Sequence, residues 1–252
     1  MLKNPRLHLG AALWAAGMAG VVALSMTVIP QLLAKSAQQI PASVAVVASL
    51  LQSGVLLALA VWAGVVLSKP LGLGAPVFEA ALSRTGAMQA LRRQLLPAAV
   101  AGLLVAGLLV YLLSAAPAEL QALGSQFQIP LAPKLLYGGV TEEILMRWGL
   151  MSALIWLPWR FLQHRNGAPR VAYVVGGVVI AALLFGLGHL SAVVAMGGEL
   201  SAPVVVYIVA GNTLPGIVFG VLYWRWGLEA AILAHALAHA ASTVALHFGG
   251  AV

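Results

Sequence analysis

The sequence predicts an all-α fold, a polytopic bundle of about seven transmembrane helices. Of the 252 residues, 62% are hydrophobic and only 8% are charged, whereas about a quarter of the residues in a soluble domain are charged. The mean hydropathy is +1.01. Apolar runs of about 20 residues, the length that crosses a bilayer as a helix, recur along the chain. Composition and run length therefore exclude a water-soluble globule.

The apolar runs divide the chain into spans and connections. We expect spans at Leu9–Leu33, Ala42–Leu67, Leu95–Ala115, Leu135–Leu157, Val171–Ala195, Ala202–Tyr223 and Leu228–Phe248. The first run follows Lys3 and Arg6, but it is longer than the roughly 7–15 apolar residues of a signal peptide, so we expect an uncleaved anchor. Residues 1–133 hold the first three spans and residues 134–252 the last four, in a single membrane domain.

The segment Pro76–Gln94 is the one sizeable stretch that we expect to lie outside the spans. It sets Phe78 and Leu82 against Arg84 and Arg92. This mixture predicts an amphipathic helix along the inner membrane surface, as part of the N-terminal half.

The basic residues fix the expected orientation. With the N-terminus inside, ten lysines and arginines fall on the inner side of the membrane, and only Lys35 and Lys134 fall on the outer side. An excess of this kind is the positive-inside signal. We therefore expect a multi-pass protein of the cell membrane with a cytoplasmic N-terminus and an outer C-terminus. The basic residues on the inner side account for the pI of about 10.3. We expect them to contact the lipid bilayer, so the positive charge does not require nucleic acid as a partner.

An ionisable cluster interrupts the fourth span. An ionisable side chain at membrane depth is costly, so each is a candidate for function. Glu143 and Arg147 are four residues apart on one helical face, in the order that favours an ion pair. Glu142 points about 100° away from Glu143. One glutamate is thus neutralised within the helix and the other is free to act elsewhere, unless all three only hold helices together.

Histidines occur in two later spans. His189 follows Phe185 by four residues, and His235 and His239 are also four residues apart, which puts these two on one helical face. A lone buried histidine is more often a packing residue, but the paired spacing is also that of metal ligands on a helix. Asn212, in the sixth span, is interpreted as a structural amide that bonds a neighbouring helix.

Most other hydrolytic chemistry is excluded by residue types. The chain contains no cysteine, and all six of its acidic residues are glutamates, which removes cysteine nucleophiles and aspartyl pairs. A zincin of the HExxH type needs a glutamate where Ala236 stands. No Gly-x-Ser-x-Gly elbow is present, and Ser191 is a weak candidate nucleophile. What remains for hydrolysis within a membrane is a glutamate that activates water, with histidine partners.

These residues resemble a known family. Glu142-Glu143-x-x-x-Arg147, Phe185-x-x-x-His189 and His235-x-x-x-His239 are similar, in this order, to the three motifs of the CPBP (CAAX protease and bacteriocin-processing) family of intramembrane proteases. That family includes the type II CAAX prenyl endopeptidases. The resemblance covers about Lys134 to Phe248 and implies an endopeptidase that acts on membrane-associated peptides or proteins.

The resemblance also implies a role for each residue. Glu142 would be the general base on a water positioned with His189. His235, together with His239, would stabilise the oxyanion of the tetrahedral intermediate. Arg147 would hold Glu143 and so orient the helix that carries Glu142. We accordingly expect the helices with Glu142, His189 and His235 to converge on a shared polar pocket.

Position 239 departs from the family, which usually has asparagine there. A neutral histidine donates from one ring nitrogen only, so the oxyanion role of His239 is open. Because histidine is a common zinc ligand, His239 also makes zinc a potential cofactor, with Glu142, His189, His235 and His239 as the ligand set. We expect that no tightly bound zinc is required.

Two other classes of function remain open. One is a catalytically silent membrane protein, an immunity or scaffold protein of the same fold. The other is a transporter whose polar cluster carries protons or ions, although no pair of matching halves supports it. The substrate itself is not specified by the sequence.

The expected orientation also places the site. Glu142 lies roughly 10 Å below the outer start of its span, and His189 roughly 9 Å from the outer end of its own. The pocket is therefore expected between the outer interface and the bilayer middle. This placement conflicts with the CAAX branch of the family, whose prenylated substrates are cytosolic.

Overall fold

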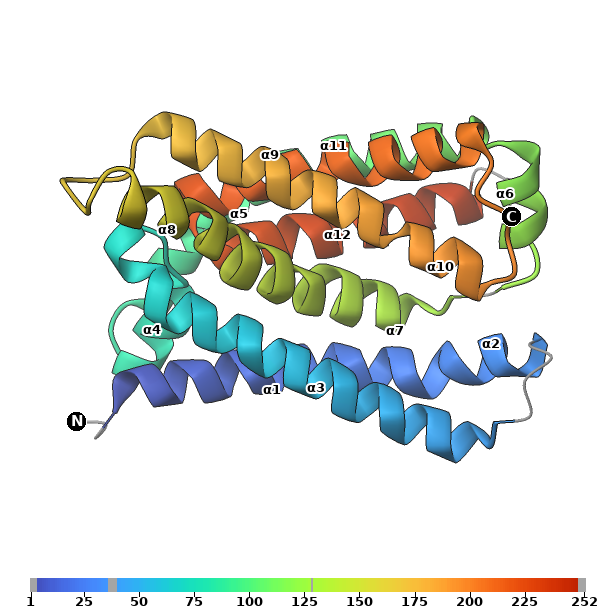
Figure 1. Cartoon of the computed structure of the whole chain (residues 1–252), viewed down its shortest axis with the longest axis horizontal. Coiled ribbons are helices and arrows are strands. Elements are labelled where there is room, and N and C mark those ends of the chain that lie inside the picture. Colours follow the sequence, from blue (N-terminus) through green and yellow to red (C-terminus); the bar gives the residue numbers. More distant parts are fainter. Residues whose placement is uncertain (1–3, 36–39, 128, 249–252) are drawn as a thin grey trace.

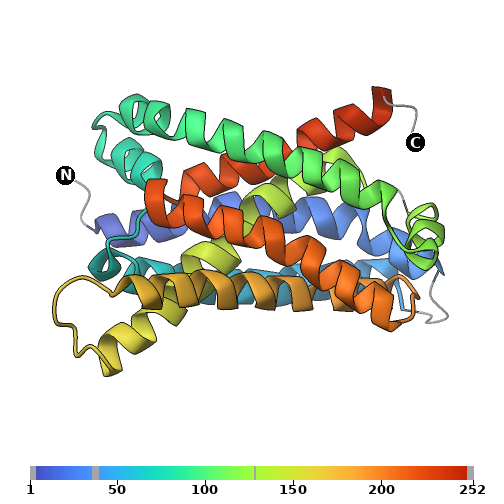
Figure 2. The same cartoon turned by 90° about the horizontal axis from the view of Figure 1, so that it is seen from above.

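The chain folds into a bundle of helices that run along one long axis (Figures 1 and 2). The computed structural model describes residues 4–35, 40–127 and 129–248, and within these ranges every regular element is a helix. Helix α1 begins at one end of the bundle and α12 ends at the other (Figure 1).

The predicted all-α fold class is confirmed. The helices are α1 (Pro5–Thr27), α2 (Ile29–Lys35), α3 (Ala42–Leu67), η1 (Lys69–Leu71), α4 (Pro76–Ser83), α5 (Ala87–Ser114), α6 (Ala118–Gly124), α7 (Leu131–Pro133), η2 (Lys134–Glu142), η3 (Ile144–Met151), α8 (Ser152–Phe161), α9 (Val171–Gly188), α10 (Leu190–Ala195), α11 (Ala202–Trp226) and α12 (Leu228–Phe248).

Six helical segments among the described residues are long and apolar enough to cross a membrane. They correspond to six of the expected spans and lie at Pro5–Lys35, Ala42–Leu67, Ala87–Ser114, Val171–Ala195, Ala202–Trp226 and Leu228–Phe248. Large apolar side chains such as Leu104 and Val206 stay exposed on their outer faces, as expected of surfaces that contact lipid tails. The protein is therefore a multi-pass membrane protein.

The expected fourth span differs from the other six. Residues 131–161 are helical throughout, but most of them, from Lys134 to Met151, form the π-helical segments η2 and η3. A π-helix bonds residue i to residue i+5 and is usually found only as a single turn at functional sites. The prediction of one regular helix over Leu135–Leu157 is thus wrong in its winding, although the segment does run along the bundle (Figure 1).

Small residues on α1 and α3 let these helices approach the π-helical segments. The hydroxyl of Thr141 donates to the carbonyl of Gly17 at 2.6 Å, and the indole of Trp148 donates to the carbonyl of Val61 at 3.2 Å. A Cβ atom at Gly64 would lie 2.2 Å from the Trp148 ring. Close approach through small residues replaces hydrophobic attraction as the means of packing in a membrane. These contacts fix the rotation of the segment that carries the two glutamates.

The segment Pro76–Gln94 is not one amphipathic helix, which corrects the prediction. Helix α4 ends at Ser83, and the chain turns through positive φ at Arg84 (55°) and Gly86 (59°). Helix α5 then begins at Ala87 and includes Gln94, which is buried. The second half of the expected surface helix is therefore the first part of a spanning helix.

A buried glutamate from α12 holds α4 in place. Oε1 of Glu229 accepts hydrogen bonds from the backbone N–H groups of Val77 and Phe78, each at 2.9 Å, and Oε2 accepts from Gln94 at 3.4 Å. Free N–H groups in the first turn of a helix favour a carboxylate at that position. This contact was not predicted, because Glu229 and the α4 residues that it caps are more than 150 residues apart.

The predicted inner cations sit mostly at one end of the bundle. They occur at the start of α1, around α4, in the connection between α8 and α9, and at the end of α11, which all lie at the end where α1 begins (Figure 1). Lys3, which belongs to this set, lies outside the described residues. The basic end is the one that the positive-inside rule assigns to the cytoplasm.

Candidate active site

A cavity of about 170 Å³ in the bundle collects the predicted site residues. Glu142 comes from η2, His235 and His239 from α12, and His189 from the junction between α9 and α10. The expected convergence of these helices on one pocket is thus what the structure shows. The cavity is also lined by Lys134, Asn212 and Gly138 and by the rings of Phe185 and Phe219.

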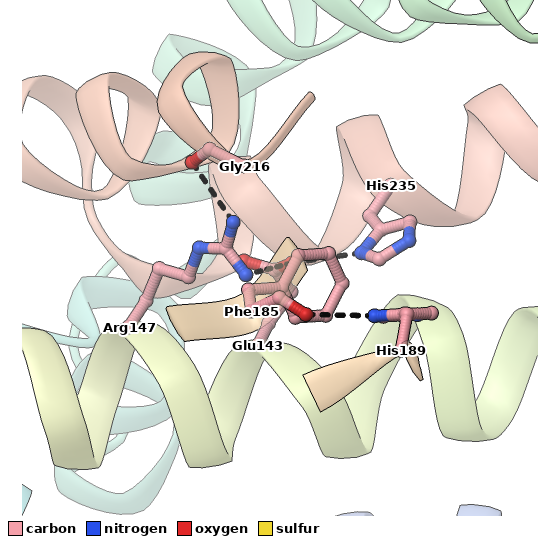
Figure 3. A network of polar contacts seen from close by, with 6 residues as sticks. All are labelled: Glu143, Arg147, Phe185, His189, Gly216 and His235. Carbon is pink, nitrogen blue, oxygen red and sulfur yellow. Dashed lines mark hydrogen bonds and ion pairs between the residues drawn. The ribbon is translucent and has the colours of Figure 1, made fainter. Parts of the chain in front are cut away.

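Glu143 is held by two partners beside this pocket. Its Oε1 lies 3.1 Å from Nη1 of Arg147 and 2.8 Å from Nδ1 of His235. Nη2 of Arg147 donates in turn to the carbonyl of Gly216 at 2.9 Å (Figure 3). Glu143 and Arg147 are almost entirely buried. The expected pairing of Glu143 with Arg147 is therefore observed, and the structure adds His235 as a second partner from another helix.

Glu142 stands in contrast to its neighbour. No hydrogen bond or ion pair joins its carboxylate to another residue of the described ranges, and its side chain lines the cavity. Arg147 approaches Glu143 rather than Glu142. One of two adjacent carboxylates is thus fixed by protein partners, and the other remains available to a ligand or a water molecule.

His189 lies where the spanning helix is interrupted. Helix α9 ends at Gly188, and the backbone N–H of His189 bonds to Gly186 and Leu187 instead of continuing the regular pattern. Nδ1 of His189 lies 2.8 Å from the carbonyl oxygen of Phe185 (Figure 3). Since a carbonyl only accepts, Nδ1 carries the proton, and in the neutral ring Nε2 is left as an acceptor. The edge-on ring of Phe185, 4.5 Å away, packs against this imidazole.

His235 is fixed by stacking as well as by its hydrogen bond. Its ring lies between those of Phe219, with centroids 4.4 Å apart, and His239, with centroids 4.9 Å apart. Nδ1 of His235 faces the carboxylate of Glu143, which directs the opposite edge of the ring, with Nε2, away from the ion pair. The two histidines of α12 therefore present stacked rings to the cavity, as their spacing predicts.

Two glycines of η2 allow α12 to come this close. A Cβ atom at Gly138 would lie 2.9 Å from Nε2 of His239, and one at Gly139 would lie 2.9 Å from Cβ of Ala236. Sequence reasoning did not identify Gly138 as a site residue. The signal that was available is the Gly-Gly pair that ends three positions before Glu142.

The side chains are not arranged as a metal site. Within the described ranges, no group of three or more His, Asp or Glu side chains has a geometry that could hold a metal ion. The ligand set considered from the sequence, Glu142, His189, His235 and His239, shares a cavity but does not form such a group. The requirement for zinc remains a prediction to be tested.

Asn212 behaves differently from its expected role. It was predicted to bond a neighbouring helix, but Nδ2 donates at 2.8 Å to the carbonyl of Ile208, one turn earlier on α11. Its side chain also lines the cavity that holds Glu142. The GxxxG spacing of Gly216 and Gly220 predicts close helix packing, and these two glycines do pack closely on Ala182 and Val178 of α9.

Comparison with known proteins agrees with this geometry. No curated protein and no solved structure gives a significant match to the chain. The family model for Rce1-like proteins, described as type II CAAX prenyl endopeptidase Rce1-like, matches residues 124–241. The matched range includes every residue from Glu142 to His239 discussed above. The chain is therefore a multi-pass membrane protein whose residues 124–241 match the Rce1-like family of type II CAAX prenyl endopeptidases.

Proposed function

We propose that this protein is an intramembrane endopeptidase in which Glu142 activates a water molecule to hydrolyse a peptide bond. The observation that carries the proposal is the difference between the two adjacent glutamates. Glu143 is bound by Arg147 and His235, whereas Glu142 lines the cavity with no partner among the described residues. A general base must be free to accept a proton, and Glu142 is the carboxylate that meets this requirement.

The first chemical step uses the acceptors of the cavity. Glu142 accepts one proton of the water, and Nε2 of neutral His189 accepts a hydrogen bond from its other O–H, which orients the oxygen for attack. The water oxygen bonds to the carbonyl carbon, and the π electrons move to the carbonyl oxygen. In the second step the C–N bond breaks, and the amine leaves with the proton that Glu142 had taken.

The developing oxyanion requires donors. His235 already donates from Nδ1 to the Glu143 carboxylate, so it donates from Nε2 as well only in its protonated, cationic form. An imidazolium would balance the negative charge that passes from Glu142 to the oxyanion, and the stacked ring of His239 supplies a further N–H. Arg147 fixes Glu143 and thus acts as a positioning residue.

The substrates are membrane-associated peptides or proteins, because the cavity lies among helices whose outer faces are apolar. We further propose that the basic end of the bundle faces the cytoplasm. The site then lies in the outer half of the membrane, and substrates approach it from that half. This orientation separates the protein from processing of cytosolic prenylated substrates.

The test compares membranes that contain the wild-type protein with membranes that contain Glu142→Gln, by quantitative peptide mass spectrometry. We expect a peptide or protein that accumulates uncut with the variant. The matched control is Glu199→Gln, since Glu199 is exposed and does not line the cavity. Purified wild-type protein should then cleave that substrate, and the Glu142→Gln protein should do so at least about 10²-fold more slowly.

Two results would contradict the proposal. Hydrolysis by purified Glu142→Gln protein at the wild-type rate would remove Glu142 from the mechanism. Identical membrane peptide profiles for the two proteins would instead favour a catalytically silent immunity or scaffold protein.

A further inference from the structure

A second cavity adjoins the one that holds Glu142. It has a volume of about 270 Å³ and lies between α5, α11 and α12, with a mostly apolar lining that includes Leu112, Ile208 and Leu246. The two cavities share the side chains of Leu109, Lys134, Asn212 and His239. The two cavities therefore adjoin, with these shared residues at the junction.

Lys134 places an uncompensated charge at this junction. Its ammonium makes no hydrogen bond or ion pair with a described residue, and its side chain is only partly exposed. The glutamates nearest in sequence do not neutralise it: Glu143 is paired with Arg147 and His235, and Glu142 has no ion-pair partner in the described ranges. A cation that lines a cavity and has no counter-ion among the described residues is available to an anionic ligand.

Asn212 supplies a second donor at the same place. One N–H of its amide is used by the carbonyl of Ile208, and the other is free, since an amide NH₂ group has two donors. Its oxygen makes no hydrogen bond within the described ranges. An ammonium and an amide N–H that line the same two cavities are donors of the kind that bind a carboxylate.

The polar groups that line the two cavities include both acceptors and donors. The Glu142 carboxylate and Nε2 of His189 are acceptors suited to water, while Lys134 and Asn212 are donors without an assigned acceptor. We propose that Lys134 and Asn212 form a carboxylate-binding subsite, and that the peptide substrate carries an acidic group that binds there. This substrate class rests on the proposed endopeptidase function.

The spacing along η2 limits where that group lies. Lys134 and Glu142 are eight positions apart on one helical segment, which corresponds to at most about 12 Å of rise. An extended peptide covers that length in three to four residues. The acidic group therefore lies within a few residues of the scissile bond.

The test measures binding without turnover, so that it is independent of catalysis. Full-length protein carrying Glu142→Gln is placed in nanodiscs of neutral phosphatidylcholine. The probe is a short leucine–alanine peptide with an N-terminal fluorophore, prepared with a free C-terminal carboxylate, as the carboxamide, and as the carboxamide with one internal glutamate. Fluorescence anisotropy gives the dissociation constant of each peptide.

We expect an acid-bearing peptide to bind about tenfold or more tightly than the plain carboxamide. Of the two acid-bearing peptides, the one with the lower dissociation constant shows whether the carboxylate comes from the C-terminus or from a side chain. Adding Lys134→Met should abolish the preference, Lys134→Arg should retain it, and Asn212→Leu should reduce it. Lys69→Met is the matched control, because Lys69 is exposed and lines neither cavity.

Equal binding of all three peptides to the parent protein would overturn the inference, whatever the variants do. A preference that survives Lys134→Met would overturn it as well. Loss of the preference when phosphatidylglycerol is added to the nanodiscs would assign the subsite to a lipid phosphate instead. If cleavage is established while the preference is absent, only this inference fails and the proposed function stands.

Discussion

Nδ1 of His235 lies 2.8 Å from Oε1 of Glu143 and so joins α12 to the helical segment that carries both glutamates. The bond connects two motifs that are 92 residues apart in the sequence. Because Arg147 binds the same oxygen, one buried carboxylate orients two functional motifs. The adjacent Glu142 is then the free carboxylate of the pair, and this difference leads to the first prediction.

The two glutamates should respond differently to the same substitution. Glu143→Gln leaves the buried Arg147 without its counter-ion, so we expect a loss of about 3–5 kcal/mol in the free energy of unfolding. Glu142→Gln removes no protein partner and should leave that free energy within about 1 kcal/mol of wild type. Denaturant unfolding of both variants in mixed micelles measures the difference. Equal destabilisation would show that Glu142 also holds the fold together.

Gly138 should be required for the position of His239. In Gly138→Ala the new Cβ would lie 2.9 Å from Nε2 of His239, so the ring must move, and we expect the rate of hydrolysis to fall at least about tenfold. Gly107→Ala is the control, because a Cβ at Gly107 meets no heavy atom within 4 Å. The control should be neutral or slightly stabilising, since alanine favours a helix. Wild-type activity in Gly138→Ala would show that the ring position is not critical.

Hydrolysis should not depend on zinc. The proposed mechanism uses one carboxylate and one histidine on the water, and the described side chains do not form a metal-holding group. We expect elemental analysis of purified protein to find less than one zinc per chain, and activity to survive dialysis against a chelator. His239→Asn should remain active, because an amide donates a hydrogen bond. Stoichiometric zinc that is lost together with activity in His239→Ala would contradict this prediction.

The orientation can be tested by labelling single cysteines in a chain that has none of its own. Asn166 and Glu199 are suitable positions, since both are exposed and lie in connections at opposite ends of the bundle. We expect Glu199→Cys, and not Asn166→Cys, to react with an impermeant thiol reagent on intact cells. Gly198 is less suitable, because a Cβ there would lie 2.8 Å from Leu123 and Val193. Labelling of Asn166→Cys alone would reverse the proposed orientation.

The sequence by itself determined the fold class, six spanning helices and the pairing of Glu143 with Arg147. These features are local. Span length follows from the hydropathy of consecutive residues, and a contact between positions four apart follows from helical geometry alone. The shared face of His235 and His239 was predictable for the same reason.

Only the tertiary structure decided which partners meet across the bundle. The bond from Glu143 to His235, the capping of α4 by Glu229 and the contact of Gly138 with His239 each join distant segments. In a membrane, lipid-facing and buried surfaces are equally apolar, so hydropathy does not reveal how each helix is rotated or which helices are neighbours. The segments η2 and η3 pack against α1, α3 and α12, and their π-helical winding is not indicated by local hydrophobic periodicity. For this reason the sequence indicated the candidate residues and the pairing of Glu143 with Arg147, while only the fold decided that His235 is the second partner of Glu143.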